Sequence, residues 1–486
     1  MSEVVADRSF RLDGTAGSSV DCAVDWAGPV DLPLADELSV QAACGIMHVH
    51  GRKVGTPTPL GVDYASVVAR VLAAQGVLAA MVARRRGAGI RGVRTSVAQA
   101  ALLSVGQYLA AATTGDRWVE PRGTGGPPFV AADGVRFEIE TFDAHAWQAF
   151  WARVGAPRAA VARGWPPFQL RFATATCPLP RELHAAAGRH GFAALRAAAD
   201  GARVGIVPVR TGGAAGGPPW WTVPLPVVAA ELSTHPGGLP LAGLVVVEST
   251  RRLQGPLAGH VLRLLGADVI RIEPPGGDPL RGVPPIAGDT SARFLALNRG
   301  KRVVELDLRR DRHAVLDLVA GSDVFVHNMA PGKAAELALT ADVLAAVRPG
   351  LVYAWASGWH DALGAAAPPG TDYLVQAHSG LGAVLWPPGR PPAPSLMTLT
   401  DVLGGLVCAQ AVLAGLLARA TTGYGQRVES SLLSAAGLLR GAVRRPGGRS
   451  AVPVCTDLAA LAADHRFAAA LEHDGCAFVR TPWEFS

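Results

Sequence analysis

From residue 241 onward, short apolar runs alternate with segments that have the spacing of amphipathic helices. The runs Leu244–Glu248 and Asp268–Glu273 predict strands, and Pro256–Leu265 between them predicts a helix with proline in its first turn and Gly266 as its stop. The same alternation continues with strands expected at 303–308, 323–328 and 351–357, and helices at 313–320 and 341–347. Strands joined by single helices predict an α/β fold with a doubly wound, mostly parallel sheet.

Glycine- and proline-rich stretches divide the rest of the chain into smaller parts. Gly134–Thr141 has the pattern of a strand, Ala144–Val154 predicts a helix and Pro180–Asp200 a second helical stretch. We therefore expect a helical segment at 1–120, a small α+β domain at 128–211, a linker at 212–240, the sheet domain at 241–445 and a C-terminal segment at 446–486.

The sequence contains an internal repeat. At a constant offset of 335 residues and without gaps, Leu38–Leu103 matches Tyr373–Leu438 at 20 of 66 positions. The clearest stretch sets AAQGVLAAMVAR at Ala73 against CAQAVLAGLLAR at Cys408. Because the identities include glutamine, glycine, proline and arginine, we interpret the match as a duplication and not as shared alanine-rich composition.

Composition excludes several classes of protein. Apolar residues make up 49% and charged residues 17%, which is typical of a globular chain, and the net charge of +6 comes from scattered arginines that predict no nucleic-acid groove. Six cysteines without a C-x-x-C pair, and an N-terminus without a secretory signal, favour a cytoplasmic protein. The apolar run Val402–Ala418 is bracketed by charges and predicts a buried helix, so no membrane partner is expected.

The loop after the first strand of the sheet, STRRLQGPLAG at Ser249, opens onto the predicted helix as in nucleotide-binding units. It lacks the G-x-G-x-x-G pattern, which argues against a dinucleotide. Arg251 and Arg252 are candidates to contact a phosphate-bearing ligand, and exposed surface arginines are the alternative. Cys44, His48 and His50 match no common zinc pattern, so no metal is expected.

Five blocks resemble the class III coenzyme A transferases of the formyl-CoA and carnitine type, in the order of that family. They are LAGLVVVESTRRLQGPLAGHVLRLLGADVIRIEPPGGDPLRG at Leu241, LNRGKRVVELDL at Leu297, SDVFVHNMAPGKAAELAL at Ser322, GTDYLVQAHSGLG at Gly370 and LTDVLGGLVCAQAVLAGLLARATTGYGQRVESSLLSAA at Leu399. The N-terminal half is similar to the later portion of the family, so the resemblance implies that the two halves are rearranged. The resemblance implies a Rossmann-like large domain and a smaller α+β domain.

The resemblance implies an acyl-CoA:carboxylate CoA-transferase, with coenzyme A bound as the acyl-CoA substrate and a carboxylic acid as acceptor. Asp401 stands at the position of the catalytic aspartate, which forms a mixed anhydride and then an aspartyl-CoA thioester. In the N-terminal copy Asp401 aligns with Ser66, and the nearest carboxylate is Asp63, so we expect that copy to be architectural. Family members form interlocked homodimers, so a homodimer is one expected assembly.

The resemblance also places further residues around coenzyme A and the reacting groups. Gly404 and Gly405 would allow close approach of substrate to backbone N–H groups that hold oxyanions. Glu336 stands where the family usually has an arginine that serves coenzyme A, and Lys333 is a candidate replacement. Leu253 stands where formyl-CoA transferases have glutamine, so formate and oxalate are not presumed as substrates. The full set of expected binding residues is Leu253, Gln254, Gly255, Pro256, Leu306, Asn328, Met329, Asp372, Gly404 and Gly405.

Two other functions fit the same fold. The first is an isomerase, either an α-methylacyl-CoA racemase or an enzyme that shifts CoA within one molecule. Racemisation requires an acid/base pair at the α-carbon, and Thr371 occupies the position of the racemase histidine, with His378 seven residues later. The second is a catalytically silent protein that binds coenzyme A or acts as a scaffold.

Overall fold

The computed structural model describes residues 8–13, 19–120, 123–213, 217–228, 232–364, 367–445 and 447–486. Its main sheet has seven strands in the order β12-β9-β8-β13-β14-β15-β7. Their bounds are β7 Trp220–Val228, β8 Val245–Ser249, β9 Asp268–Glu273, β12 Arg302–Glu305, β13 Val324–His327, β14 Val352–Ser357 and β15 Tyr424–Ser431. All neighbouring pairs are parallel except β15 with β7. The mostly parallel sheet predicted from the sequence is confirmed.

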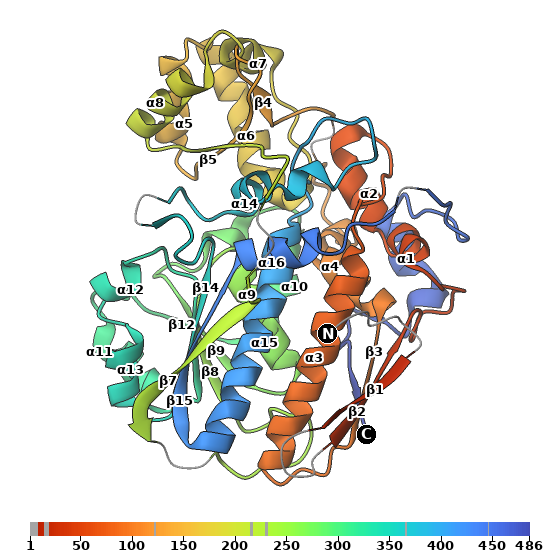
Figure 1. The fold of residues 1–486 in the computed structure, drawn as a ribbon, viewed down its shortest axis with the longest axis vertical. Helices are drawn as coiled ribbons and strands as arrows, with labels where there is room; N and C mark the ends of the chain where they lie inside the picture. The colour runs from red at the N-terminus through yellow and green to blue at the C-terminus, as the bar shows by residue number, and fades with distance from the viewer. Residues whose placement is uncertain are drawn as a thin grey trace.

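Helices cover both faces of this sheet (Figure 1). On one face, α9 (Gln254–Leu264) and α15 (Leu399–Thr422) pack against the strands, and on the other lie α11 (Arg312–Ala320) and α13 (Ala341–Val347). Consecutive strand residues point to opposite faces: Val246 belongs to the α9–α15 core and Val247 to the α11–α13 core. The sheet is therefore doubly wound, as the uniformly apolar strands indicate.

Shorter elements connect the strands of the main sheet. Between β9 and β12 lie η2 (Pro279–Gly282), β10 (Ile286–Ala287), β11 (Thr290–Ser291) and α10 (Ala292–Asn298). The remaining connections carry α12 (Lys333–Glu336), α14 (Asp372–His378) and η4 (Leu381–Ala383), and α16 (Leu432–Arg440) follows β15.

A small α+β unit lies beyond one end of the main sheet, at the top of Figure 1. Its antiparallel sheet contains β4 (Phe129–Val130), β5 (Arg136–Glu140) and β6 (Gly205–Pro208), with helices α5 (Ala144–Arg153), α6 (Arg158–Thr174), α7 (Arg181–Ala187) and α8 (Phe192–Ala202). Arg171 of α6 is buried and forms ion pairs with Glu138 at 3.0 Å and Glu140 at 3.1 Å. These pairs join α6 to β5, the central strand of the small sheet.

The N-terminal part contains α1 (Glu37–Ala43), α2 (Ile46–Gly51), η1 (Arg52–Val54), α3 (Tyr64–Arg85) and α4 (Val97–Ala112). The range expected to be helical also holds strands, in a second sheet of order β1-β2-β3-β18 formed by Arg8–Asp13, Ser19–Asp25, Gly92–Ser96 and Glu484–Phe485. The C-terminal segment further holds α17 (Leu458–Ala463), η5 (His465–Phe467), β16 (Leu471–Asp474) and β17 (Cys476–Val479). The range expected to be a linker contains β7, which pairs at the edge of the main sheet.

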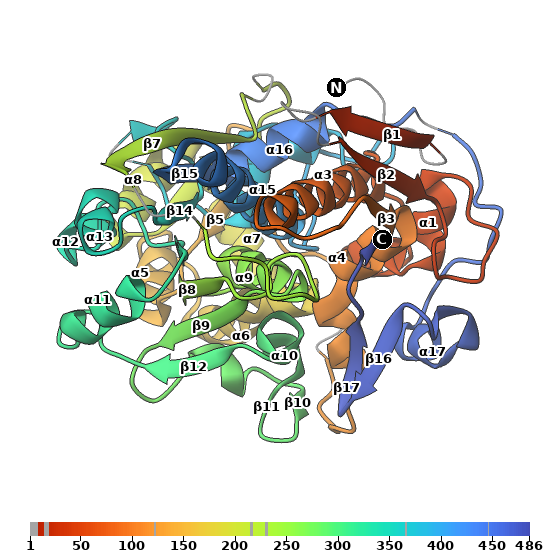
Figure 2. The same cartoon turned by 90° about the horizontal axis from the view of Figure 1, so that it is seen from below.

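The two copies of the repeat adopt the same local structure. Helix α3 begins at Tyr64 and α15 at Leu399, and α1 begins at Glu37 and α14 at Asp372, each pair separated by the 335-residue offset. The long helices α3 and α15 lie side by side in both views (Figures 1 and 2). Both are long and apolar enough to cross a membrane, yet most of each is buried inside the fold. Packing between the copies explains this apolar character.

A buried ion cluster fixes the end of β8. Glu248 is fully buried and accepts a hydrogen bond from Lys301 Nζ at 2.8 Å and from Thr250 Oγ1 at 2.7 Å. It also forms an ion pair with the buried Arg271. Because Thr250 begins the loop that follows β8, the cluster holds this loop beside the cavity described next.

Candidate active site

A cavity of about 940 Å³ opens at the carboxyl ends of the parallel strands. Residues after β8, β9, β12, β13 and β14 line it, and residues 140, 142 and 172 of the small α+β unit contribute to its wall. The strand order reverses between β8 and β13. The chain runs from β8 through β9 to β12 on one side of this point, and from β13 through β14 to β15 on the other side. Ligands of open α/β sheets bind at such a switch point.

Asp401 lies in the first turn of α15 and its half-buried side chain lines the cavity. Within the described part of the chain its carboxylate has no hydrogen bond or ion pair, so both oxygens are free to react with a ligand. Burial raises the pKa of Asp401 well above its usual range, and the negative charge of Asp372 raises it further, whereas Arg252 acts in the opposite direction.

Asp372, the first residue of α14, holds this turn in place. Its Oδ1 atom accepts hydrogen bonds from Thr400 N at 2.6 Å, Thr400 Oγ1 at 2.5 Å and Asp401 N at 2.9 Å. Burial raises the pKa of Asp372 to about 6, although the hydrogen bonds from Thr400 and Asp401 favour the ionised form. The bonded carboxylate therefore has a positioning role, and the unbonded Asp401 is the candidate nucleophile.

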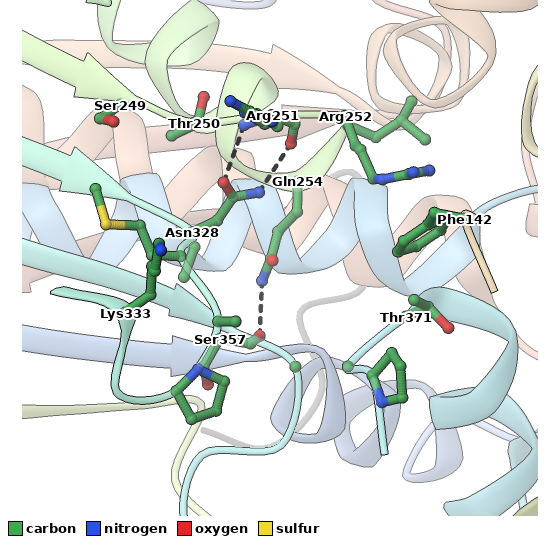
Figure 3. A pocket seen from close by; sticks show the side chains of 18 of the residues that line it. Phe142, Ser249, Thr250, Arg251, Arg252, Gln254, Asn328, Lys333, Ser357 and Thr371 are labelled. Atoms are coloured by element: carbon green, nitrogen blue, oxygen red, sulfur yellow. Dashed lines mark hydrogen bonds between the residues drawn. The ribbon is translucent and has the colours of Figure 1, made fainter. Parts of the chain in front are cut away.

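Hydrogen bonds between strand ends shape one wall of the cavity (Figure 3). Arg251 N donates to Asn328 Oδ1 at 2.9 Å, and Asn328 Nδ2 donates to Arg251 O at 2.8 Å. Gln254 Nε2 donates to Ser357 O at 3.1 Å. The loop after β8 is thus tied to the residues that follow β13 and to the end of β14.

The wall near β12 and α12 carries basic side chains. Lys333 lines the cavity and forms an ion pair with Glu336 at 2.9 Å, and Glu336 also pairs with Arg309. Glu336 is thus neutralised by two cations, and these three side chains together have a net positive charge. Positive charge here suits the phosphates of a nucleotide-bearing ligand.

Seven of the eleven residues expected at the site line the cavity: Leu253, Gln254, Leu306, Asn328, Met329, Asp372 and Asp401. The other four, Gly255, Pro256, Gly404 and Gly405, lie behind the wall. A Cβ atom on Gly405 would lie 2.5 Å from Gln254 O, and one on Gly404 2.8 Å from Leu432 Cδ2. Both glycines are inside α15, where backbone N–H groups bond within the helix. Their positions therefore support close packing of α15 and not the oxyanion contact expected from the sequence.

Several cavity residues are not predicted from the sequence. Glu140, Phe142 and Phe172 belong to the small unit and reach the cavity only through the tertiary fold. His360 also lines it, with Nε2 2.9 Å from Glu429 Oε2 and its ring stacked on Trp221 at a centroid distance of 4.1 Å. Their local sequences carry no recognisable motif, so only the folded chain shows them.

The sequence matches the family described as CoA-transferase family III over residues 27–222 and 241–442. This chain belongs to CoA-transferase family III. The two matched segments lie on either side of residues 223–240 and include both copies of the repeat, in agreement with the resemblance and the duplication inferred from the sequence.

This chain spans about half the length of the curated relatives that it matches. An acetyl-CoA:oxalate CoA-transferase of Acetobacter aceti is 37% identical over 40% of this chain and 51% of its own. A succinyl-CoA:glutarate CoA-transferase of Mus musculus is 35% identical over 40% of this chain and 46% of its own. The crystal structure of Rv3272 from M. tuberculosis has 33% identity and a TM-score of 0.39, covering 42% of this chain and 58% of that one.

Proposed function

We propose that the chain is an acyl-CoA:carboxylate CoA-transferase with Asp401 as its nucleophile. A carboxylate oxygen of Asp401 attacks the thioester carbonyl, the C–S bond breaks, and a mixed anhydride and CoA thiolate form. The thiolate attacks the aspartyl carbonyl and releases the first acid, which leaves an aspartyl-CoA thioester. The acceptor carboxylate then attacks this thioester, which breaks its C–S bond and gives a second mixed anhydride and CoA thiolate. The thiolate attacks the acceptor's carbonyl carbon, which forms the new acyl-CoA and releases the Asp401 carboxylate.

One observation carries this proposal: Asp401 presents an unbonded carboxylate to a 940 Å³ cavity at the switch point of the sheet. A nucleophile must be free to reach the carbonyl carbon of the thioester. A buried side chain that caps a helix through hydrogen bonds is not free in this way. Asp372 supplies the hydrogen bonds that fix the turn, so Asp401 is not required as a helix cap. The names of the relatives support a transfer of CoA between carboxylic acids.

We further propose where coenzyme A lies. The loop after β8, the residues after β13 and the basic wall at Lys333 are on the same cavity as Asp401. The nucleotide part would lie toward Lys333 and Asn328, with the pantetheine reaching Asp401. The tie between Arg251 and Asn328 gives this path a fixed wall.

The cavity also supports a site formed within one chain. Glu140 and Phe142 come from the N-terminal half, whereas Asp401 and Asn328 come from the C-terminal half. In an interlocked homodimer of the family, two chains would supply such parts. Here α3 and α15 provide the contact between copies inside a single chain, so we propose one transferase site per chain, with or without homodimer formation.

The experiment is to incubate the protein with an acyl-CoA and then with hydroxylamine, which converts an activated aspartyl group to a hydroxamate, and to map the modified residue by peptide mass spectrometry. The proposal predicts the hydroxamate at Asp401, and its absence in Asp401→Ala. Asp63→Asn, the matched control in the N-terminal copy, should be modified like the wild type. Coenzyme A binding without any modification would support a silent binding protein, and deuterium uptake at the α-carbon would support a racemase.

A further inference from the structure

Arg252 is held in a backbone conformation that residues with a side chain rarely adopt. Its φ angle is 68°. The preceding Arg251 is tied to Asn328 through both its N–H and its carbonyl, and the following Leu253 is buried at the start of α9. Strain of this kind persists where neighbours on both sides fix the backbone, and it concentrates at functional sites.

The side chain of Arg252 points away from the proposed coenzyme A path. In Figure 3 its guanidinium group reaches toward Phe142, on the side of the cavity opposite Asn328 and Lys333. The guanidinium carbon lies 3.3 Å from the centroid of the Phe142 ring, which itself is 49% exposed. Arg252 is thus available to the acyl end of a substrate and not to the nucleotide end.

No acidic side chain neutralises this cation directly. Within the described residues Arg252 has no ion pair or hydrogen bond through its guanidinium group, although it is half-buried. Three carboxylates lie within electrostatic range of Arg252. Glu140 is paired with Arg171 at 3.1 Å, Asp278 is paired with Arg271, and Asp401 faces the cavity as the proposed nucleophile. A planar guanidinium with free donors binds a carboxylate through two parallel hydrogen bonds.

A second cavity of about 420 Å³ begins at Arg252. It shares Glu140, Phe142, Phe172, Arg252 and Tyr373 with the main cavity. The remainder of its wall is mostly apolar and is formed by Phe168, Gln169, Leu170, Arg171, Pro279, Leu280, Gly282, Val283, Pro284 and Thr141. Its charged member Arg171 is already paired with Glu138 and Glu140, so Arg252 is the cation left to meet an anionic group where the two cavities join.

We propose that Arg252 binds a second carboxylate at the far end of the acyl group, so that the enzyme prefers dicarboxylic acids and their CoA monothioesters. This inference rests on the proposed transferase function. The thioester carbonyl lies at Asp401, the carbon chain follows the apolar wall, and the distal carboxylate pairs with the guanidinium. Arg252 is a specificity-determining residue that takes no part in bond making or breaking.

The test compares succinyl-CoA with butyryl-CoA, which share a four-carbon chain and differ in the distal carboxylate. The readout is the apparent second-order rate constant for hydroxamate formation at Asp401, measured in the wild type, Arg252→Met and Arg252→Lys. The wild type should prefer succinyl-CoA by roughly 30-fold, the contribution of a charge-assisted hydrogen-bonded pair. Arg252→Met should reduce this preference to within about threefold, and Arg252→Lys should restore part of it, because it keeps the charge but not the planar group.

Arg251→Met is the matched control, since it removes the neighbouring arginine and should change both substrates by the same factor. A wild type without preference for succinyl-CoA would overturn the inference, as would a preference that survives in Arg252→Met. An equal loss with both thioesters in Arg252→Met would assign Arg252 to the coenzyme A moiety and would also overturn it. Absence of hydroxamate from the wild type with either thioester would instead overturn the transferase function itself.

Discussion

Glu37 and Asp372, which are 335 residues apart, have the same structural role in the two copies of the repeat. Glu37 Oε2 accepts a hydrogen bond from Ser66 N at 2.8 Å, and Asp372 Oδ1 accepts one from Asp401 N at 2.9 Å. Burial raises the pKa of Glu37 to about 7 and that of Asp372 to about 6. An acid that holds the first turn of the long helix is therefore present in both copies, whereas the position of the proposed nucleophile is aspartate in one copy and serine in the other.

Removing the charge of Asp372 should move the pH dependence of the reaction. Asp401 must be ionised to attack, so activity falls as pH falls through its pKa, which burial and the charge of Asp372 both raise. In Asp372→Asn the negative neighbour is absent, so the acid limb of the apparent second-order rate constant should shift to lower pH. A pH profile of hydroxamate formation measures this. A limb that stays in place or moves to higher pH would contradict the coupling of the two acids.

Asp401→Asn should stabilise the protein at neutral pH. The folded-state pKa of Asp401 is raised above its unfolded value, so the folded state binds the proton more tightly and the ionised side chain costs stability as pH rises above about 4. Urea unfolding at pH 7.5 should show a higher midpoint for the variant, and the difference should shrink toward pH 4. A destabilised variant at pH 7.5 would show that ionised Asp401 supports the fold.

Removing Glu248 from the buried ion cluster at the end of β8 should lower the free energy of unfolding. Glu248→Ala leaves Arg271 and Lys301 buried without their shared partner, and such a loss costs about 3–5 kcal/mol of unfolding free energy. Arg302→Ala, which removes the exposed ion pair with Asp268, should cost at most about 1 kcal/mol. Urea unfolding of both variants checks this. Equal effects would show that the cluster is dispensable.

Gly405→Ala should disturb the contact between α15 and α9. The added Cβ would lie 2.5 Å from Gln254 O, which forces the helices apart and costs about 1–3 kcal/mol. Gly106→Ala in α4 is the matched control, because its Cβ would lie 3.7 Å from Val479 Cγ2 in ordinary contact. We expect the control to be neutral or stabilising by up to about 1 kcal/mol. Thermal or urea unfolding separates the two outcomes.

Local patterns predicted most of the sheet domain and the register of the repeat. Strand β9 and helix α13 have the bounds expected from the sequence, since apolar alternation and turn residues are local signals. Helix α6 was missed because Pro166 and Pro167 lie inside it, and prolines usually end a helix. Strand β7 lies in the range expected to be a linker, because prolines interrupt it, and an edge strand tolerates such prolines.

The sequence predicted site residues only within the five blocks that resemble the CoA-transferase family. Asp401, Asn328 and Leu306, which were expected at the site, line one cavity. Phe142 was missed because its approach depends on how the small unit folds over the sheet. Arg252 was noticed as one of two adjacent arginines, but its direction depends on a left-handed backbone angle that no sequence pattern indicates.

The most direct test of the central claim measures aspartyl-CoA formation at different protein concentrations. The protein is mixed with acyl-CoA, and the fraction of chains that carry CoA on Asp401 is followed by intact-protein and peptide mass spectrometry, with Asp401→Ala as the blank. If one chain holds a complete site, the rate per chain is the same from nanomolar to micromolar protein, and one CoA is bound per chain. A rate that rises with protein concentration, or an adduct on any other residue, would contradict it.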